Sequence, residues 1–466
     1  MPGVASFSGR GGHGPMDFDA VVLAGGLSKQ LYPLVSKELP KALLPVGNKP
    51  VLSYTLEMLE ANNLTHPHVV VAGEEAASRV RAWISDAFQD RLTARVTAVP
   101  EDSGTAEALR AVAHQIRAKD FIVLSGDLVC DVALGAVAAA HCRSTAAATA
   151  LLCSQPNSSF AAESKDKGKA TTAPPVDYIG LTTDGSSLLF CASAADVEHE
   201  LRIRRSILRA AGQMVLRTDL MDTHLYVFNR VVLDVLEAQP GIASVKRDLL
   251  PYLVRTQLSP LPSSVTGPSS GPDDAVSRED SSGSAAGPVA SPSLVEALSH
   301  PARRGLAGAV RRCGVYLAGP DKFCNRLNSL QQYIEVNREV AGDAVHLTGF
   351  PVSSFNNVVH PSVEIGSKTT VGAQCVLGEG VRLGDKCSVK RSVLGKNCRI
   401  GANVKIINSV LMAGCVVEDG CHVQNSVVSA GGHLQERASL KDCYVGAAYT
   451  VGTGEEHRGE SLAKKQ

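Results

Sequence analysis

The order of apolar and polar residues predicts an α/β domain in the first half of the chain. Between Asp17 and about Leu258, short apolar runs alternate with stretches of helical periodicity. The runs that predict strands are 19–25, 68–73 and 121–127, and the stretches that predict helices are 51–63 and 106–116. Strands separated by helices are typical of a doubly wound, Rossmann-like domain with a parallel sheet. Ligands of such sheets bind beyond the carboxyl ends of the strands.

A second pattern, with a period of six residues, begins near Val363. Its first aliphatic positions, each six residues after the last, are Ile365, Val371, Leu377, Leu383 and Val389, and four of the five precede a glycine. The sequence RSVL at Arg391 then returns as NSVL and NSVV, at steps of 17 residues. Six-residue steps in turns of this length indicate a triangular β-helix with one inward aliphatic residue per side. We predict a left-handed parallel β-helix of hexapeptide repeats, with glycines at its sharp corners.

Polar tracts interrupt and separate these two patterns. Residues 154–175 lack periodicity, and the Ser/Pro/Gly-rich tract within 259–300 contains few residues that could be buried. Both are predicted to be disordered, because such sequences cannot bury enough apolar surface to fold. The predicted order is a disordered tail (1–16), the α/β domain (17–258), a disordered linker (259–300), a strand–helix connector (301–350), the β-helix (351–451) and a polar tail (452–466).

Composition excludes some classes of protein. Of the 466 residues, 46 are Lys or Arg and 46 are Asp or Glu, so nothing indicates a nucleic-acid-binding or membrane-surface protein. No apolar run in the sequence is long enough to span a bilayer. The 12 cysteines include no C-x-x-C pair, and half of them fall in the predicted β-helix. We expect buried thiols in a reducing compartment, the cytosol, rather than a metal site.

The first predicted strand ends in a loop suited to phosphate. Glycines allow backbone N–H groups to approach a phosphate closely, and Gly25 and Gly26 supply them at the strand end. Lys41 could add a cation, and Asp127, after another strand, could hold Mg²⁺. The alternatives are a tight turn without ligand for the glycines, an ordinary surface lysine for Lys41 and a solvated turn residue for Asp127.

These motifs together resemble the sugar-phosphate nucleotidyltransferase family. LAGG, then PK and LLPVGNKP, within residues 23–50, is similar to the signature L-A-G-G-x-G-x-R-L-x-P-L followed by P-K-P. SGTAEAL, from Ser103 to Leu109, resembles the family's second loop, near the base and sugar, and Asp127 stands where the family places a metal-binding aspartate. The nucleotide-binding positions implied by this resemblance are Leu23, Ala24, Gly25, Gly26, Lys41, Gly104 and Asp127.

The signature is incomplete at its charged positions. Leu31, Pro33 and Leu34 fix the register, which puts Gln30 at the arginine and Ser28 at a glycine. Glutamine is neutral and makes no bidentate charged contact with a phosphate, and losing such a contact can lower a rate by several powers of ten. The family's Glu-Lys-Pro triplet, which handles the sugar phosphate, is also absent. We predict a degenerate site with no catalytic residue, no resident metal ion and no cofactor.

Asp248 has two interpretations. It could replace a second metal-binding carboxylate of the family, or it could be an acidic residue at a helix N-terminus, where the helix dipole favours negative charge. We prefer the second.

The middle of the chain distinguishes among families that join this fold to a β-helix. Residues 188–208, 222–236 and 244–258 resemble the gamma-subunit family of translation initiation factor two B, a guanine-nucleotide exchange factor. The family's epsilon subunit performs exchange with an added helical domain, and the length of this chain favours gamma. The resemblance implies a cytosolic, non-catalytic subunit that supports GDP release from the initiation factor two GTPase. Its implied partners are the epsilon subunit and the alpha, beta and delta regulatory subunits, with no direct contact to nucleic acid or membrane.

Two enzymes remain as alternatives. A mannose-1-phosphate guanylyltransferase or glucose-1-phosphate adenylyltransferase would share both domains, but should keep the arginine and the Glu-Lys-Pro triplet. A bifunctional uridylyl/acetyltransferase would need a longer β-helix with a catalytic histidine. His422 is a candidate, although a lone histidine on a coil is more often a surface or packing residue.

Overall fold

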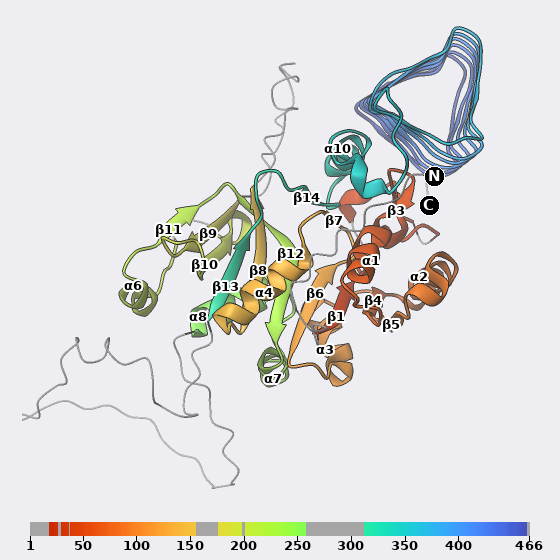
Figure 1. Cartoon of the computed structure of the whole chain (residues 1–466). Helices are drawn as coiled ribbons and strands as arrows, with labels where there is room; N and C mark the ends of the chain where they lie inside the picture. Colours follow the sequence, from red (N-terminus) through yellow and green to blue (C-terminus); the bar gives the residue numbers. More distant parts are fainter. Residues whose placement is uncertain are drawn as a thin grey trace, which may run out of the picture.

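The computed structural model describes residues 18–26, 29–36, 38–154, 176–197, 201–257 and 312–463. In Figure 1 an α/β domain and a triangular β-helix lie side by side, with α10 (Leu330–Ala341) between them. The predictions for Ser28 and for the tracts 1–16, 155–175 and 259–300 fall outside the described residues. No helix within the described ranges is both long and apolar enough to cross a membrane.

A seven-stranded sheet forms the centre of the first domain, in the order β13-β8-β12-β6-β1-β4-β5. Its strands are β1 (Phe18–Leu23), β4 (His68–Ala72), β5 (Arg95–Val99), β6 (Asp120–Ser125), β8 (Ala148–Ser154), β12 (Leu220–Asn229) and β13 (Cys313–Leu317). One strand departs from the predicted parallel sheet: β12 is antiparallel to β6 and β8. Leu220, where β12 begins, pairs with Ser154, where β8 ends, so the chain turns back into the sheet from that end.

Helices cover both faces of this sheet, as the doubly wound prediction requires. The helices are α1 (Val51–Ala61), α2 (Glu74–Phe88), α3 (Thr105–Val112), α4 (Leu134–Ser144), α7 (Val231–Ala238) and α8 (Leu250–Thr256). Apolar residues of α3, α7 and α8 form one core with the sheet, and those of α1, α2 and α4 form another. The central sheet is therefore buried on both sides.

A small second sheet extends the domain away from the β-helix (Figure 1). It has the order β10-β9-β11 and consists of β9 (Asp177–Leu181), β10 (Leu188–Ser193) and β11 (Val215–Arg217), with α6 (Arg205–Ala211) before β11.

The predicted connector belongs largely to the first domain. Its strand β13 extends the central sheet by parallel pairing with β8, and β14 (Cys324–Arg326) pairs with β7 (Leu128–Cys130) directly after β6. Only α10 and the residues that follow it lead to the β-helix. The central sheet therefore extends past the predicted boundary at residue 258, because β13 is its edge strand beside β8.

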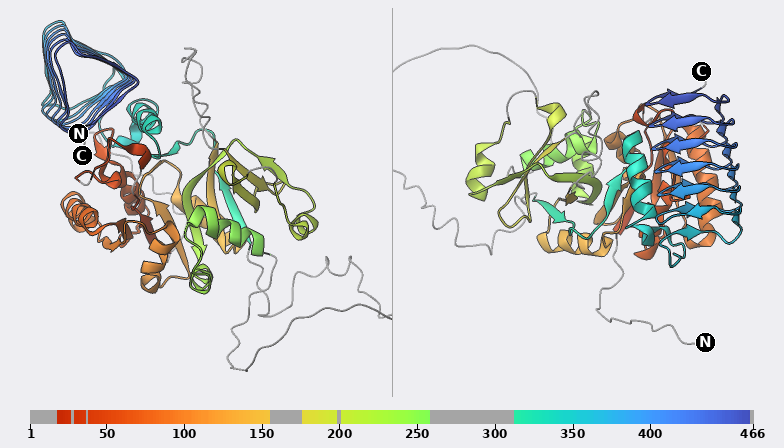
Figure 2. Two further views of the ribbon diagram at one scale, coloured as in Figure 1. Left: turned by 180° about the vertical axis from the view of Figure 1, so that it is seen from behind. Right: turned by 90° about the horizontal axis from the view of Figure 1, so that it is seen from above.

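Three parallel sheets form the sides of the β-helix, and Figure 2 shows their coils stacked as layers. The first sheet contains β15 (Val358–Val359), β18 (Val376–Leu377), β21 (Val393–Leu394), β24 (Val410–Leu411), β27 (Val427–Val428), β30 (Tyr444–Val445) and β33 (Ser461–Leu462). The second contains β16 (Glu364–Ile365), β19 (Arg382–Leu383), β22 (Arg399–Ile400), β25 (Val416–Val417), β28 (His433–Leu434) and β31 (Thr450–Val451). The third contains β17 (Thr370–Val371), β20 (Ser388–Lys390), β23 (Lys405–Ile407), β26 (His422–Gln424), β29 (Ser439–Lys441) and β32 (Glu456–Arg458).

The interior of the β-helix is apolar, as its period predicts. The six cysteines of this region, Cys375, Cys387, Cys398, Cys415, Cys421 and Cys443, are buried in its core. Leu377, Leu383 and Val389 are buried with them, but Ile365 in the first coil is 50% exposed. The described chain places no preceding coil against Ile365, because β16 is the edge strand of its sheet.

The glycines after the inward aliphatic residues have a different cause from the predicted one. A Cβ on Gly366 or Gly384 would lie 2.5–2.6 Å from backbone atoms of the next coil. The left-handed positions of the β-helix are occupied by other residues, among them Lys386 (φ 57°), Asn403 (φ 58°) and Gly380 (φ 68°). Glycine is therefore required here by close stacking of the coils rather than by a positive φ.

The predicted polar tail is also part of the β-helix. β32 pairs with β29, and β33 pairs with β30, so the described coils extend to Leu462. The segment was predicted as a tail because Glu456, His457 and Arg458 are polar.

A separate apolar cluster joins the two domains. Leu31 and Leu34 from the N-terminal loop pack in it with Tyr333 and Val340 of α10. The outward face of the first β-helix sheet completes the cluster through Val376, Val393, Val410 and Val427. Hydrogen bonds reinforce the contact: Asn48 Nδ2 donates to the carbonyl of Leu394 at 2.8 Å. The burial of Leu31 and Leu34 explains why these loop positions are leucine.

Candidate functional site

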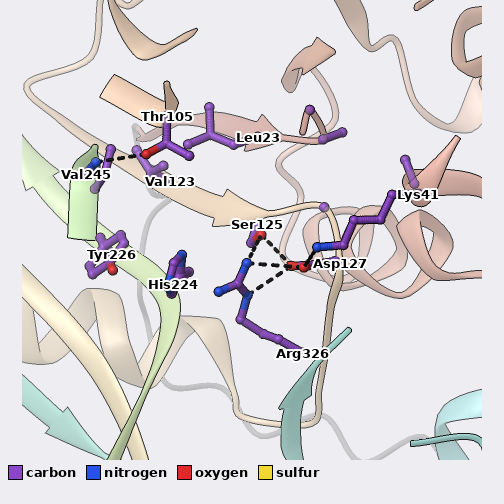
Figure 3. A pocket seen from close by; sticks show the side chains of 14 residues that line it. Leu23, Lys41, Thr105, Val123, Ser125, Asp127, His224, Tyr226, Val245 and Arg326 are labelled. Carbon is purple, nitrogen blue, oxygen red and sulfur yellow. Dashed lines mark hydrogen bonds and ion pairs between the residues drawn. The ribbon is translucent and has the colours of Figure 1, made fainter. Parts of the chain in front are cut away.

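A small cavity lies at the carboxyl ends of β1 and β6, where the sequence predicts the ligand site (Figure 3). Its volume is about 90 Å³, whereas pockets for small molecules typically measure about 300–1,000 Å³. The residues that line it are Leu23, Ala24, Gly25, Lys41, Ala42, Thr105, Val123, Ser125, Gly126, Asp127, His224, Tyr226, Val245 and Arg326. The predicted positions Leu23, Ala24, Gly25, Lys41 and Asp127 are thus brought together, while Gly26 and Gly104 do not line the cavity.

Asp127 is held by two cations. The guanidinium of Arg326, at the end of β14, donates from Nε to Oδ1 at 3.0 Å and from Nη2 to Oδ2 at 3.1 Å. Lys41 forms an ion pair with Oδ2, and the Ser125 hydroxyl donates to Oδ1. Figure 3 shows these side chains converging on the carboxylate. Only 4% of the Asp127 side chain is exposed, so this ion-pair network is almost fully shielded from water.

Burial and charge act on Asp127 in opposite directions. Burial alone would raise its pKa, because the charged form loses hydration. The charges of Arg326 and Lys41, with hydrogen bonds from Lys41 and Ser125, outweigh that effect and hold the pKa of Asp127 far below its usual range. Asp127 is therefore ionised, and its charge is compensated within the protein.

The cavity does not fit a divalent cation. Asp127 is the only acidic residue among those that line it, and both of its carboxylate oxygens already bind cationic groups. Mg²⁺ takes oxygen ligands and would have to displace Arg326 and Lys41 against charge repulsion. The described residues also contain no cluster of three or more His, Cys, Asp or Glu side chains that could hold a metal ion.

The predicted glycines have structural causes in this fold. A Cβ on Gly104 would lie 2.2 Å from the carbonyl oxygen of Ala243, and the next residue, Thr105, accepts a hydrogen bond from Val245 N. A Cβ on Gly25 would lie 3.0 Å from the backbone N of Ala72. Gly26 has a φ of +115° with open space around it. Close approach of the backbone explains two of these three glycines without a bound nucleotide.

Gln30 and Asp248 take no part in the cavity. Gln30 is exposed in a 3₁₀ turn (Lys29–Leu31). Asp248 lies within the π-helical turn η6 (Val245–Leu249), and its Oδ2 accepts hydrogen bonds from the backbone N–H groups of Ala243 at 3.0 Å and Ser244 at 2.8 Å. This contact agrees with the second interpretation of Asp248, as an acidic residue that stabilises the start of a helical segment.

His422 lies in β26, on the third side of the β-helix. It pairs in register with Lys405 and Ser439, and the next residue, Val423, points into the core. Burial and the charge of Lys405 lower the pKa of His422. This position fits the surface interpretation of His422.

Sequence reasoning missed Arg326, His224 and Tyr226. His224 has a φ of 58° and is neutral, because burial and then the charges of Arg326 and Lys246 keep its pKa well below the usual value. The Tyr226 hydroxyl donates to Asp222 at 2.6 Å. These two residues occupy one wall of the cavity and Arg326 another (Figure 3). No motif marks any of the three, and only the pairing of β14 with β7 brings Arg326 to Asp127.

Comparison with known families agrees with both domains. The nucleotidyl transferase family model matches residues 19–161, and the family model described as the eIF2B subunit epsilon LbH domain matches residues 356–456. The α/β domain is therefore of the nucleotidyltransferase type, and the stacked parallel strands form a left-handed β-helix.

Similarity to whole proteins decides the family. Translation initiation factor eIF2B subunit gamma of Schizosaccharomyces pombe is 32% identical over 452 residues, which cover 96% of this chain and 90% of that protein. The chain belongs to the eIF2B gamma-subunit family. Its counterpart from Dictyostelium discoideum is 29% identical over 395 residues, covering 81% of this chain and 87% of that protein. Membership of this family assigns the chain a role in translation initiation.

Part of this chain is also similar to an enzyme. Mannose-1-phosphate guanyltransferase of Schizosaccharomyces pombe is 32% identical over 127 residues, which cover 26% of this chain and 34% of that enzyme. About a quarter of this chain is therefore similar to part of a mannose-1-phosphate guanyltransferase.

Proposed function

We propose that this chain is a non-catalytic subunit of the cytosolic guanine-nucleotide exchange complex of translation initiation. In this role it supports GDP release from initiation factor two only together with an epsilon-type subunit, and it assembles with the alpha, beta and delta regulatory subunits. The two gamma-subunit relatives support membership of such a complex, since both are subunits of eIF2B. This chain is also 34% identical over 119 residues to an eIF2B epsilon subunit of Dictyostelium discoideum. This similarity supports an epsilon-type partner that is related in sequence to this chain.

One observation carries the non-catalytic assignment. Arg326 and Lys41 neutralise Asp127 inside a cavity of about 90 Å³. Phosphoryl transfer from a nucleotide depends on metal ions and cations that are positioned around the phosphates. In this site Arg326 and Lys41 are bound to Asp127, the carboxylate that would hold the metal. The cations therefore do not face a phosphate, and the carboxylate does not face a metal ion.

The alternative is an active sugar-phosphate nucleotidyltransferase. The family match over residues 19–161 favours it, as does the similarity to a guanyltransferase. It requires the Asp127–Arg326 ion pair to open when nucleotide and Mg²⁺ bind. Separating a buried bidentate pair costs several kcal/mol, which the nucleotide would have to supply from its binding free energy.

Release of labelled GDP from the cognate GTPase tests the proposal. The rate is measured with this chain alone, with its epsilon-type partner alone, and with both at equal concentration. We expect the chain alone to leave the spontaneous rate unchanged and the pair to exceed the partner alone. If the isolated chain accelerates release as well as the pair does, the chain carries an exchange site of its own and the proposal fails.

A further inference from the structure

A second, much larger cavity lies beside the small sheet, on the part of the α/β domain farthest from the β-helix in Figure 1. It has a volume of about 810 Å³ and is bounded by β9, β10, α6, η6 and α8. It shares no lining residue with the Asp127 cavity. Its size is within the range of ligand-binding pockets, about 300–1,000 Å³.

The inner surface of this cavity is apolar and acidic. It includes seven buried aliphatic side chains: Leu152, Ile179, Leu188, Leu189, Ile207, Leu250 and Val254. The buried polar groups are two carboxyls, Asp177 and Asp222. Lys246 pairs with Asp177 at 2.7 Å, and the Tyr226 hydroxyl donates to Asp222 at 2.6 Å. Lys246, the one lysine of the lining, is thus already engaged by an acidic partner.

The rim, in contrast, carries four exposed arginines: Arg202, Arg204, Arg247 and Arg255. Arg204 donates to the carbonyl of Arg255 at 3.3 Å, and Arg255 donates to that of Pro251 at 3.2 Å. Among the residues that the structure describes, no carboxylate lies within 4.0 Å of any of these four guanidinium groups. Within the described residues, positive charge is therefore concentrated around one opening without a carboxylate partner.

The surface next to the rim is also basic and partly apolar. Residues 201–217 include five arginines and no acidic residue, and one of the five, Arg217, pairs with Asp219. Leu208, Val215 and Leu216 in this segment are 37–45% exposed. Exposed aliphatic residues among cations are typical of protein interaction surfaces rather than of a solvated charged face.

The distribution of charge favours a protein segment over a small phosphorylated ligand. A small ligand buries most of its surface, which would bring a phosphate close to Asp177 and Asp222. An extended acidic segment avoids this repulsion, since its apolar side chains can enter the cavity while its carboxylates remain at the arginine rim. β10 is an outer strand of its sheet, and all of its residues, Leu188–Ser193, line the cavity, so the segment can lie along a sheet edge.

We propose that this cavity is a docking site for an acidic, leucine-bearing segment of a partner protein. Apolar side chains of the segment occupy the cavity, and its Asp or Glu residues pair with the rim arginines in charge-assisted hydrogen bonds. The docking site goes beyond the proposed function, and its test uses this chain alone. A negative result for the docking site would therefore not contradict the proposed function, and a negative result for the proposed function would not contradict the docking site.

Fluorescence anisotropy of a labelled decapeptide, built from aspartate and glutamate with two leucines, measures the interaction with the full chain. We expect saturable binding that weakens as salt is raised, because ions screen exposed charges. A decapeptide with serine in place of both leucines should bind less tightly, since the cavity then remains unfilled. GTP, mannose 1-phosphate and a short single-stranded RNA serve as competitors.

The double variant R204E/R255E should weaken binding of the acidic peptide by about tenfold or more. The same variant should gain affinity for a peptide in which lysines replace the acidic residues, and a purely structural role would not produce this reversal. Arg399→Glu is the matched control, because Arg399 is an exposed arginine on β22 of the β-helix. It should leave both affinities unchanged, and the melting temperature of each variant confirms folding.

Three results would overturn the docking site. The first is no binding of the acidic peptide by the wild-type chain. The second is equal binding by the wild type and R204E/R255E. The third is displacement of the peptide by a phosphorylated competitor at a lower concentration than by unlabelled peptide, which would assign the cavity to a phosphorylated ligand.

Discussion

Arg326 binds both carboxylate oxygens of Asp127, although 199 positions separate the two residues in the sequence. Arg326 ends β14, and three residues later Ser329 caps α10 by accepting a hydrogen bond from Gln332 N. α10 then packs against the β-helix. The ion pair therefore lies on the path by which the β-helix is attached to the α/β domain. A position that resembles a metal ligand thus holds β14 against the end of β6 inside the α/β domain, directly before α10.

Removing the charge of Asp127 should destabilise the chain strongly. Asp127→Asn leaves the largely buried side chains of Arg326 (12% exposed) and Lys41 (14% exposed) without a counter-charge, and breaking a buried pair in this way costs about 3–5 kcal/mol. Urea unfolding, monitored by circular dichroism, measures the loss. Glu57→Gln is the control, because the Lys49–Glu57 pair (2.7 Å) leaves Glu57 43% exposed. That change should cost about 1 kcal/mol or less, and equal losses for the two variants would contradict a structural role of Asp127.

The same ion pair predicts how stability depends on pH. The pKa of Asp127 is lowered in the folded chain, so as pH falls the unfolded chain takes up this proton first. The stabilisation is complete above about pH 4, near the pKa of an aspartate in an unfolded chain, and is lost progressively below it. The difference in unfolding free energy between wild type and Asp127→Asn should therefore be constant from about pH 5 to 7 and should narrow below about pH 4. A difference that widens on acidification would show that Asp127 is not ionised in the folded chain.

The β-helix was predictable from sequence because its packing is periodic. Leu383 and Val389 repeat at the step that the coil geometry imposes, and the structure buries both. Its end was not predictable from the apolar period, since His457 and its neighbours in β32 are polar and continue the coil by pairing with β29. The order and direction of the strands in the α/β domain could not be predicted from the sequence either. The alternation of strands and helices does not encode the reversal of β12, which depends on where β8 leaves the sheet.

Of the candidate site, only the residues that belong to the nucleotidyltransferase signature were predictable from the sequence. Gly25, Lys41 and Asp127 lie together as the family resemblance implies. Arg326 could not be foreseen, because an arginine in a connector carries no motif and reaches the site through tertiary pairing of β14 with β7. A search for lone basic residues after the last strand of the sheet is the nearest available signal.

An aspartate inside the β-helix should disrupt it. Ile406 is completely buried in the coil core together with Val404, whereas Val410 packs outward in the cluster with α10. Ile406→Asp buries an ionisable group without a partner, at a cost of several kcal/mol. Ile365→Asp is the control, because Ile365 is half exposed in the first coil. We expect a large drop in melting temperature for the first variant and a small one for the second; similar drops would mean that the two positions are not buried as described.

The contact between the domains depends on Asn337 of α10. Its Oδ1 accepts a hydrogen bond from Gly47 N at 3.0 Å, and its Nδ2 donates to the carbonyl of Tyr333 at 2.9 Å. Asn337→Ala leaves the Gly47 N–H unsatisfied, at a cost of about 1–3 kcal/mol. Proteolysis between the domains should become faster in this variant. Gln331→Ala, on the exposed side of the same helix, should leave the cleavage rate unchanged, and equal acceleration by both variants would argue against this contact.

Whether the Asp127 cavity can catalyse nucleotidyl transfer decides between a non-catalytic subunit and an active nucleotidyltransferase. Pyrophosphate release by the highly purified chain is the most direct measurement, with Mg²⁺, each nucleoside triphosphate and the common hexose 1-phosphates. We predict no release above a protein-free blank. Gln30→Arg should not restore it, since Gln30 is exposed and outside the cavity. Release that scales with the wild-type chain and disappears in a folded Asp127→Asn variant would contradict the account and identify the chain as an active nucleotidyltransferase.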